Sequence, residues 1–262
     1  MNGASGNYGM GLPIQASDAA PHIDLGLRVI HFAMFAIFIL WSIFFVYLLL
    51  KYRKRAGVAA QREHMGLFWS LLPDAIVLGF EILLIFFYAI PGWTRFKMDA
   101  PKPEDSTQIE IVAQQFNWNI RYPGPDGKFG RTDPKLIDFA NPLGIDPTDP
   151  ASKDDYVSVN QLHLPMGKPV LIRLSSMDVI HSFFIPEFRV KQDAVPGMRV
   201  PVWFTPTREG QYEITCAQLC GVGHAIMRGD VSVHTPEDFQ KWLAEASAPP
   251  AEARAAAPIE QW

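Results

Sequence analysis

Residues 216–227 read CAQLCGVGHAIM and hold the only two cysteines of the 262-residue chain. Cys216 and Cys220 lie four positions apart, His224 follows four positions later, and Met227 ends the stretch. Two cysteines in such a setting can form a disulfide, a structural zinc site or a redox metal site. A disulfide leaves the histidine and the methionine unexplained, and zinc has no use for a thioether. Thiolate, imidazole and thioether together are the soft ligand set that favours copper.

A copper site of this kind needs another histidine from elsewhere in the chain, and His181 is the candidate. It lies in DVIHSFFIP, an apolar and aromatic stretch that indicates the end of a buried strand. A lone histidine there is ordinarily structural. Two cysteine sulfurs, however, can each bridge two metal ions, so that six groups would complete a binuclear copper centre. These groups are His181, Cys216, Cys220, His224, Met227 and one backbone carbonyl of the loop.

The strings DVIHSFFIP, VKQDAVPGMR and YEITCAQLCGVGHAIM closely resemble subunit II of haem-copper cytochrome c oxidases, and the likeness covers nearly the whole chain. The resemblance implies two N-terminal transmembrane α-helices followed by an all-β cupredoxin-like sandwich domain that holds a binuclear copper centre, CuA. It also implies that Gln218 gives its carbonyl oxygen to copper. The family usually has glutamate there, which helps to bind magnesium at the interface with subunit I. The neutral amide of Gln218 is a poorer ligand for that hard cation and weakens the magnesium site.

Two apolar segments near the N-terminus are long enough to cross a bilayer. FAMFAIFILWSIFFVYLLL spans residues 32–50, and LFWSLLPDAIVLGFEILLIFFYAI spans residues 67–90. A buried soluble helix is the alternative, but such helices seldom are apolar on every face. The loop between the segments carries Lys51, Arg53, Lys54, Arg55 and Arg62. The positive-inside rule therefore places this loop in the cytoplasm, and we expect an integral protein of a bacterial plasma membrane with its CuA domain on the periplasmic face.

Composition divides the chain into four regions. We expect an N-terminal extracytoplasmic segment over residues 1–25, a transmembrane hairpin over 26–92 with helices at about 26–50 and 67–90, a cupredoxin-like CuA domain over 95–245, and a flexible tail over 246–262. The first segment lacks the pattern of a cleaved signal peptide, so the first helix is expected to act as an uncleaved export signal. Short β-rich runs between Pro, Gly and Asp clusters indicate the sandwich, and residues 122–156 indicate an extended loop.

Three acidic residues near the second apolar segment are candidates for a proton pathway or a subunit interface. Asp74 and Glu81 are seven residues apart and therefore lie on one face of the expected helix, where intramembrane acids are functional suspects. The resemblance implies a glutamate three residues before Trp69, at the mouth of a proton pathway into subunit I. This chain has Gly66 at that position. Glu63 is the nearest acidic alternative, and Glu81 can instead face another subunit.

An aromatic string is the candidate for the point where electrons enter. The family carries a QWYW-like string whose first tryptophan is thought to receive the electron from cytochrome c. Here the string is QFNW, which begins at Gln115 and Phe116 and ends at Trp118. Phe116 is therefore the candidate docking residue, with a place in the sandwich core as the equal alternative. Acidic residues outnumber basic ones over residues 95–245, so a freely diffusing basic donor is only weakly favoured.

The resemblance implies an electron-transfer subunit that accepts electrons from a cytochrome c donor at CuA and passes them to haem in subunit I, where oxygen is reduced and protons are translocated. The alternative is a membrane-anchored protein that binds or delivers copper, which would need no complete set of six ligands. Expected partners are subunit I with its haem and CuB, other oxidase subunits, membrane lipid, and either cytochrome c or a c-type haem domain held in the assembly; nucleic acid is not expected. His163 is expected to be structural, and no metal context surrounds His22, His31, His64 and His234.

Overall fold

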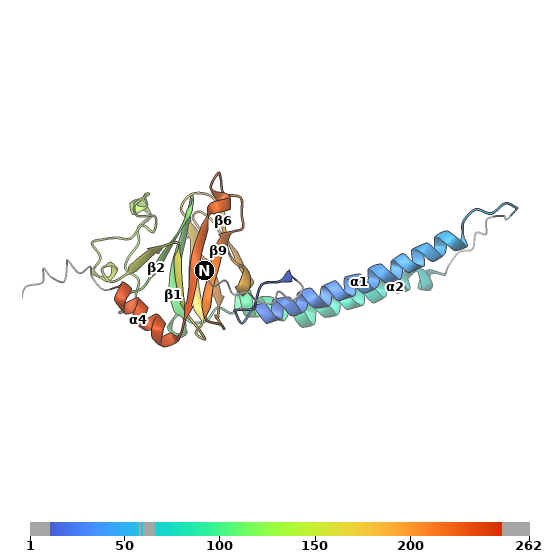
Figure 1. Cartoon of the computed structure of the whole chain (residues 1–262), viewed down its shortest axis with the longest axis horizontal. Coiled ribbons are helices and arrows are strands. Elements are labelled where there is room, and N and C mark those ends of the chain that lie inside the picture. The colour runs from blue at the N-terminus through green and yellow to red at the C-terminus, as the bar shows by residue number, and fades with distance from the viewer. Residues whose placement is uncertain (1–10, 58, 60–65, 248–262) are drawn as a thin grey trace, which may run out of the picture. The chain divides into compact units, whose positions relative to one another are not determined.

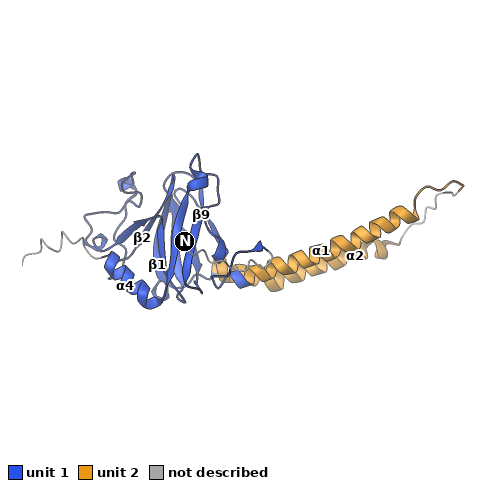
Figure 2. Cartoon of the chain, in the orientation of Figure 1, with its two compact units in different colours: residues 1–21, 99–262 blue, residues 22–98 orange. Residues whose placement is uncertain are grey.

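The computed structural model describes residues 11–57, 59 and 66–247, which divide into a helical unit and a β unit (Figures 1 and 2). The helical unit covers residues 22–98, and the β unit combines the described residues of 1–21 with those from 99 onward. Glu63 and His64 lie outside the described residues, as does the expected tail from residue 248. The candidate metal ligands, residues 181–227, belong wholly to the β unit.

Two helical segments dominate the helical unit. The first is α1, Ala20–Lys51, and the second runs without a break through α2 Leu67–Leu84, a π-helical turn Ile85–Ala89, α3 Ile90–Trp93 and a second π-helical turn Thr94–Met98. Each segment has 32 residues, which corresponds to about 48 Å at 1.5 Å per residue. Both are long and apolar enough to cross a membrane, whose hydrocarbon core is about 30 Å thick.

The helices extend further than hydropathy indicates. The first begins at Ala20 instead of about residue 26, and the second continues to Met98 instead of ending near residue 90. Apolar character marks only the part of a helix that lies in lipid, whereas the backbone can continue into the polar region. Pro91 does not end the second segment, which continues through α3 directly after the π-helical turn Ile85–Ala89.

The β unit consists of two five-stranded sheets. One sheet has the order β3-β2-β1-β5-β8, with β1 Thr107–Gln114, β2 Asn117–Tyr122, β3 Tyr156–Val159, β5 Val170–Ser176 and β8 Val200–Phe204. The other has the order β4-β10-β9-β6-β7, with β4 Gln161–Pro165, β6 His181–Ile185, β7 Val190–Ala194, β9 Gly210–Cys216 and β10 Arg228–His234. The pairs β1–β5 and β4–β10 are parallel, and the other pairs are antiparallel.

Side chains from both sheets fill one apolar core. Ile111 of β1 and Ile172 of β5 are fully buried, as are Leu162 of β4, Phe183 of β6 and Ile214 of β9. Along β10 buried positions alternate with more exposed ones, as expected when only one face of a strand meets the core. The predicted fold class, two N-terminal transmembrane helices followed by an all-β cupredoxin-like sandwich, is confirmed.

The end of the N-terminal segment is part of the β unit. Ala16 donates its backbone N–H to the carbonyl of Glu187 at 3.0 Å and accepts one from Thr207 at 2.9 Å. The hydroxyl of Ser17 donates to the carbonyl of Phe188 at 2.7 Å, and both Ala16 and Ser17 are buried. The sequence held no signal for this docking, because the partners of Ala16 and Ser17 are backbone groups of segments distant in sequence.

Two further features surround the sheets. The expected loop over residues 122–156 is largely irregular. The buried Arg121 holds it through an ion pair to Asp155 and a 2.7 Å bond to the carbonyl of Gly130, and it also pairs with Glu110 of β1. Helix α4, Pro236–Ala246, was not predicted. Its signal is present in Thr235, which caps the helix, followed by proline and two acids.

Candidate metal centre

Adjacent strands of one sheet bring the predicted metal ligands together. His181 begins β6, and Cys216 ends the neighbouring strand β9, where it pairs with Phe183 of β6. The loop after β9 returns through a short 3-10 helix, His224–Ile226, to β10. A histidine far from the cysteines in sequence is therefore beside them because antiparallel pairing aligns the two strand ends.

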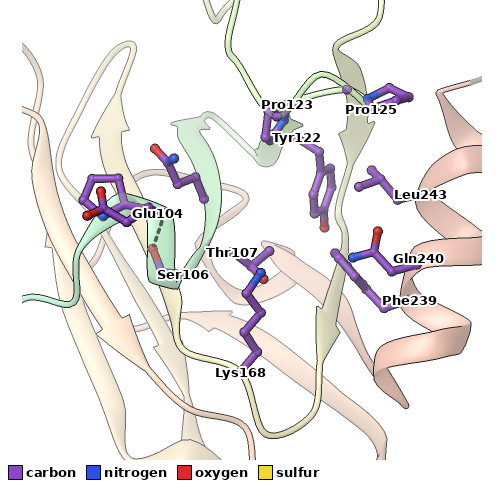
Figure 3. A pocket seen from close by; sticks show the side chains of 14 residues that line it. Glu104, Ser106, Thr107, Tyr122, Pro123, Pro125, Lys168, Phe239, Gln240 and Leu243 are labelled. Atoms are coloured by element: carbon purple, nitrogen blue, oxygen red, sulfur yellow. Dashed lines mark hydrogen bonds between the residues drawn. The ribbon is translucent and has the colours of Figure 1, made fainter.

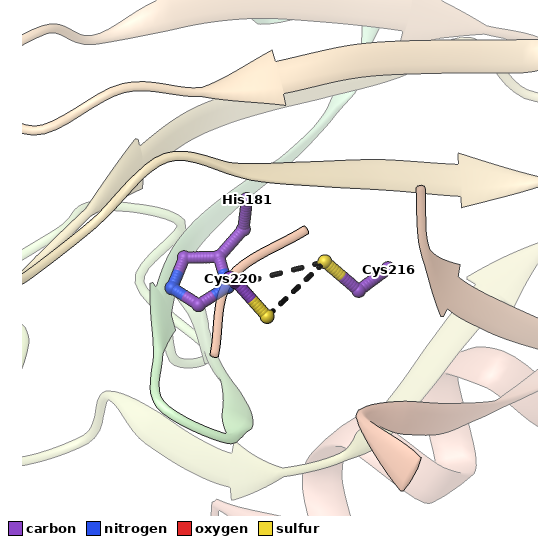
Figure 4. A group of neighbouring side chains, drawn as sticks. All are labelled: His181, Cys216 and Cys220. Atoms are coloured by element: carbon purple, nitrogen blue, oxygen red, sulfur yellow. Dashed lines mark hydrogen bonds between the residues drawn. The ribbon is translucent and has the colours of Figure 1, made fainter. Parts of the chain in front are cut away.

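His181 and the two cysteines form the centre of the site (Figure 4). Cys216 Sγ lies 4.0 Å from His181 Nδ1 and 3.8 Å from Cys220 Sγ. The ligand atoms of these three residues all lie within 4.8 Å of one another. No other described group of histidine, cysteine and acidic side chains gathers three such atoms this closely.

The remaining predicted ligands surround this centre. Cys220 Sγ lies 3.7 Å from His224 Nδ1 and 3.9 Å from Met227 Sδ. The carbonyl oxygen of Gln218 lies 3.2 Å from Cys216 Sγ, although Gln218 as a whole is exposed to solvent. All six groups proposed from the sequence are thus brought together in one place.

The donor set fits a soft metal ion. Both cysteines are free, and their 3.8 Å sulfur separation is far above the roughly 2.05 Å of a disulfide. A metal–thiolate bond of about 2.3 Å allows one ion to reach two sulfurs at this separation. Met227 is buried, so its thioether is held inside the cluster. A thioether is a ligand for copper but not for zinc. The set therefore matches copper better than zinc.

Asp178 orients the imidazole of His181, and sequence reasoning did not identify it. His181 Nε2 lies 2.9 Å from Asp178 Oδ1, and the backbone N–H groups of Val179 and Gln115 also donate to this carboxylate, at 2.6 and 2.7 Å. A proton on Nε2 leaves the lone pair of Nδ1 facing Cys216. Burial alone would raise the pKa of Asp178, but the hydrogen bonds from His181 and the two amides outweigh it and lower the pKa. The carboxylate stays ionised.

The thiol of Cys220 is protonated at neutral pH when no metal is bound. Burial, followed by the hydrogen bond and charge of Cys216, raises the pKa of Cys220 to about 11. A metal cation must therefore displace a proton from this sulfur, as is usual for thiolate sites.

The two aromatic candidates occupy different places. Trp118 is fully buried, with its ring edge-on to His181 at 6.3 Å and to Phe183 at 5.8 Å between centroids. Trp118 therefore offers no exposed ring to a donor. Phe116 is half-buried and lies against the ligand loop, because a Cβ added to Gly223 would be only 2.4 Å from its ring. Phe116 packs on the core and also reaches the surface next to the site.

The candidate acids lie apart from this cluster. Asp74 and Glu81 are exposed on α2, and neither carboxyl has a hydrogen-bonding or ionic partner within the described part of the chain. His163 Nδ1 lies 2.8 Å from His234 Nε2, and the His163 ring stacks on Trp242. These contacts suit the structural role expected for His163.

A separate hollow on the β unit holds none of the predicted ligands (Figure 3). Its volume is about 320 Å³, and Tyr122, Lys168, Phe239 and Leu243 are among the residues that line it. It contains neither cysteine nor histidine. Among the described residues, the cluster at the ends of β6 and β9 is the group that could hold a metal ion.

Comparisons with known proteins show what the chain is similar to. Residues 107–233 match the family model described as cytochrome C oxidase subunit II, periplasmic domain. The alternative cytochrome c oxidase subunit 2 of Bradyrhizobium diazoefficiens is 36% identical over 225 residues, which cover 85% of this chain and 79% of that protein. The cytochrome c oxidase subunit 2 of Thermostichus vulcanus is 34% identical, with 88% and 77% covered.

Solved structures of related proteins are similar as well. The periplasmic domain of subunit II of cytochrome oxidase from Bradyrhizobium japonicum is 28% identical, covers 56% of this chain and 96% of its own, and has a TM-score of 0.42. The sequence relatives carry the assignment, because their identity extends over most of both chains. The chain belongs to the cytochrome c oxidase subunit II family, whose members are part of haem-copper oxidase complexes.

Proposed function

We propose that the chain is the electron-transfer subunit of a respiratory cytochrome c oxidase, which accepts electrons from a cytochrome c donor and passes them to haem in subunit I. The observation that carries this proposal is the convergence of six donor groups around Cys216 and Cys220. When bound to these residues, a binuclear copper centre, CuA, would supply one-electron transfer. Oxygen reduction and proton translocation belong to subunit I.

The protein residues hold the ligands in fixed positions. His181 is fully buried, and its ring is held by Asp178, while Met227 is 1% exposed. Cys216 is anchored at the end of a strand, and its N–H donates to the carbonyl of Met227 at 3.2 Å. Packing of this density keeps water out and limits movement of the ligands. Such rigidity suits a site whose charge changes without a change of ligands.

Gln218 is assigned a backbone role. Its carbonyl lies among the donors, and its exposed side chain is an amide rather than a carboxylate. The neutral amide is a weaker ligand for magnesium at the interface with subunit I. We therefore infer that copper binding is retained while the magnesium site is weakened.

The ligand loop offers an apolar surface to a protein partner. Leu219, Val222 and Ile226 alternate with the ligands and are 78%, 103% and 78% exposed. Aliphatic side chains gathered on one exposed loop are typical of an interaction site. Phe116 lies against the same loop and is the candidate residue for receiving an electron from cytochrome c or from a c-type haem domain in the assembly.

The membrane segments are assigned to contacts with subunit I, other oxidase subunits and lipid, with the β unit on the periplasmic side of a bacterial plasma membrane. Asp74 and Glu81 have no partner in the described part of this chain, and an unpaired carboxylate is costly in hydrocarbon. We infer that Asp74 and Glu81 either contact partner subunits or belong to a proton pathway. Glu63 remains a further candidate for that pathway.

Copper delivery is the alternative function. A delivery site releases its metal readily, whereas His181 and Met227 are buried here. The two functions are separated by reducing the assembled oxidase with cytochrome c in the absence of oxygen. Cys216→Ser should leave the haems of subunit I in place but prevent their rapid reduction. Rapid reduction in that variant would favour delivery.

A further inference from the structure

Gln115 contacts two separate segments of the candidate metal site, the one before His181 and the one that carries Cys220. It follows β1, and its backbone N–H donates to Asp178 Oδ2 at 2.7 Å. Its side-chain Nε2 donates to the backbone carbonyl of Cys220 at 2.6 Å. One residue thus joins the segment before His181 to the loop that carries Cys220.

The contact with Asp178 extends to the imidazole. The same carboxylate accepts from His181 Nε2 through its other oxygen, Oδ1. Gln115 and His181 therefore hold the two oxygens of Asp178 between them. A shift of Gln115 would alter both the orientation of His181 and the position of the Cys220 backbone.

The residue after Cys220 is suited to this contact. A Cβ added to Gly221 would lie 2.8 Å from Gln115 Nε2, closer than real Cβ contacts. Gly221 also has φ of +134°, which residues with a side chain rarely adopt. The loop thus presents a bare backbone where the amide of Gln115 approaches, and a side chain at position 221 would obstruct this contact.

We propose that Gln115 is a positioning residue for the copper centre, fixing the Cys220 loop relative to the Asp178–His181 pair. This proposal rests on the proposed copper function and adds a residue outside the six donors to it. The decisive group is the N–H donor of the side chain. Gln115 itself is exposed, so its replacement leaves the apolar core intact.

Two substitutions separate the hydrogen bond from packing. Gln115→Glu keeps the length of the side chain and the backbone N–H, but an ionised carboxylate cannot donate to the Cys220 carbonyl. Gln115→Ala removes the side chain altogether. Gln211→Ala is the matched control, because Gln211 is an exposed glutamine on β9 whose side chain bonds Ser232 instead of a ligand segment.

The full-length chain in detergent is examined in two states. With copper, we measure the rate at which a copper-selective chelator extracts the metal and the wavelength of the sulfur-to-copper absorption bands. Without metal, we measure the reaction rate of the two thiols with a thiol reagent. Both Gln115 variants should raise both rates at least about fivefold, the ratio equivalent to one hydrogen bond of about 1 kcal/mol, and should shift the absorption bands. Gln211→Ala should match the unmodified chain.

The outcomes distinguish this proposal from the copper function. If the unmodified chain binds no copper, the proposed function fails, while the thiol rates of the metal-free chain still test Gln115. Wild-type rates and bands in Gln115→Glu would overturn the proposal. A change in Gln115→Ala alone would also overturn it, because packing and not the donor would then be responsible. Circular dichroism of the metal-free variants checks that the sandwich remains folded.

Discussion

Asp178 Oδ1 lies 2.9 Å from His181 Nε2, and this contact turns the other ring nitrogen of His181 toward Cys216. Removing the carboxylate should therefore weaken metal binding although Asp178 is not a ligand. We expect Asp178→Ala to lower copper affinity about 10- to 100-fold, the usual range for partners of metal-bound histidines. Competition with a chelator measures this affinity. Asp193→Ala, at an exposed acid on β7, is the control, and equal affinities in the two variants would contradict the orienting role.

Gln218 should act through its backbone alone. Gln218→Ala keeps the carbonyl oxygen, so both copper ions should be retained. Gln218→Glu adds a carboxylate and should strengthen manganese binding in the assembled oxidase, because hard divalent cations prefer charged oxygen ligands. Manganese paramagnetic resonance measures this binding. A full-strength interface signal in the unmodified oxidase would contradict the weakened magnesium site.

Phe116 should matter more for electron transfer than for copper binding. Its ring lies against Gly223 but supplies no ligand atom, so Phe116→Ala should reduce copper content only modestly and slow donor oxidation strongly. Stopped-flow mixing with reduced cytochrome c measures the rate. Phe139→Ala is the control, because Phe139 is 83% exposed on the long loop. An unchanged rate in Phe116→Ala would remove that residue from the path.

A salt series in the same experiment tests how the donor approaches. The exposed Leu219, Val222 and Ile226 form an apolar surface, and the net charge of the chain is only −4. Screening by salt should therefore change the rate little. A steep fall of the rate with ionic strength would instead indicate steering of a basic, freely diffusing donor.

The ligand types were predictable from sequence because cysteine, histidine and methionine at this spacing share one chemistry and resemble a known family. His181 was a candidate before the resemblance is considered, because it lies in an apolar, aromatic stretch typical of the end of a buried strand. Asp178 was not a candidate, because an acid three residues before a histidine is common, and only the fold aims its carboxylate at Nε2. Gln115 was quoted merely as the start of an aromatic string, and its two hydrogen bonds depend on backbone groups that sequence does not reveal.

Membrane helices and sandwich strands were predictable because apolar length and short β-rich runs are local signals. Their ends were less accurate, since the helix continues through Pro91 to Met98. The burial of Trp118 was also missed, because aromatic residues occur both in cores and at docking surfaces. Its indole nitrogen is buried without a hydrogen-bond partner in the described structure, and its ring lies edge-on to His181.

His163 should make the β unit less stable in acid. Burial, with a smaller contribution from the charge of His234, lowers the pKa of His163 from 6.5 to about 4. The unfolded chain therefore binds more protons between these two values, so the free energy of unfolding should fall as the pH is lowered from about 6.5 toward 4. Above pH 6.5 this contribution is fully present and constant.

Thermal unfolding of the metal-free chain, followed by tryptophan fluorescence, measures the acid effect. His163→Phe can still stack on Trp242 but cannot bind a proton, so its unfolding temperature should depend less on pH over the same window. An identical pH dependence in this variant would assign the acid sensitivity to other groups.

Copper analysis of the purified full-length chain tests the central claim most directly, when combined with paramagnetic resonance. Cys216 and Cys220 are free, and their sulfurs are 3.8 Å apart, a separation suited to thiolates that share metal ions. We predict two copper ions per chain, a purple colour and a hyperfine pattern from one electron shared by two copper nuclei, all lost in Cys220→Ser. One copper ion per chain with the blue spectrum of a mononuclear site would contradict the account.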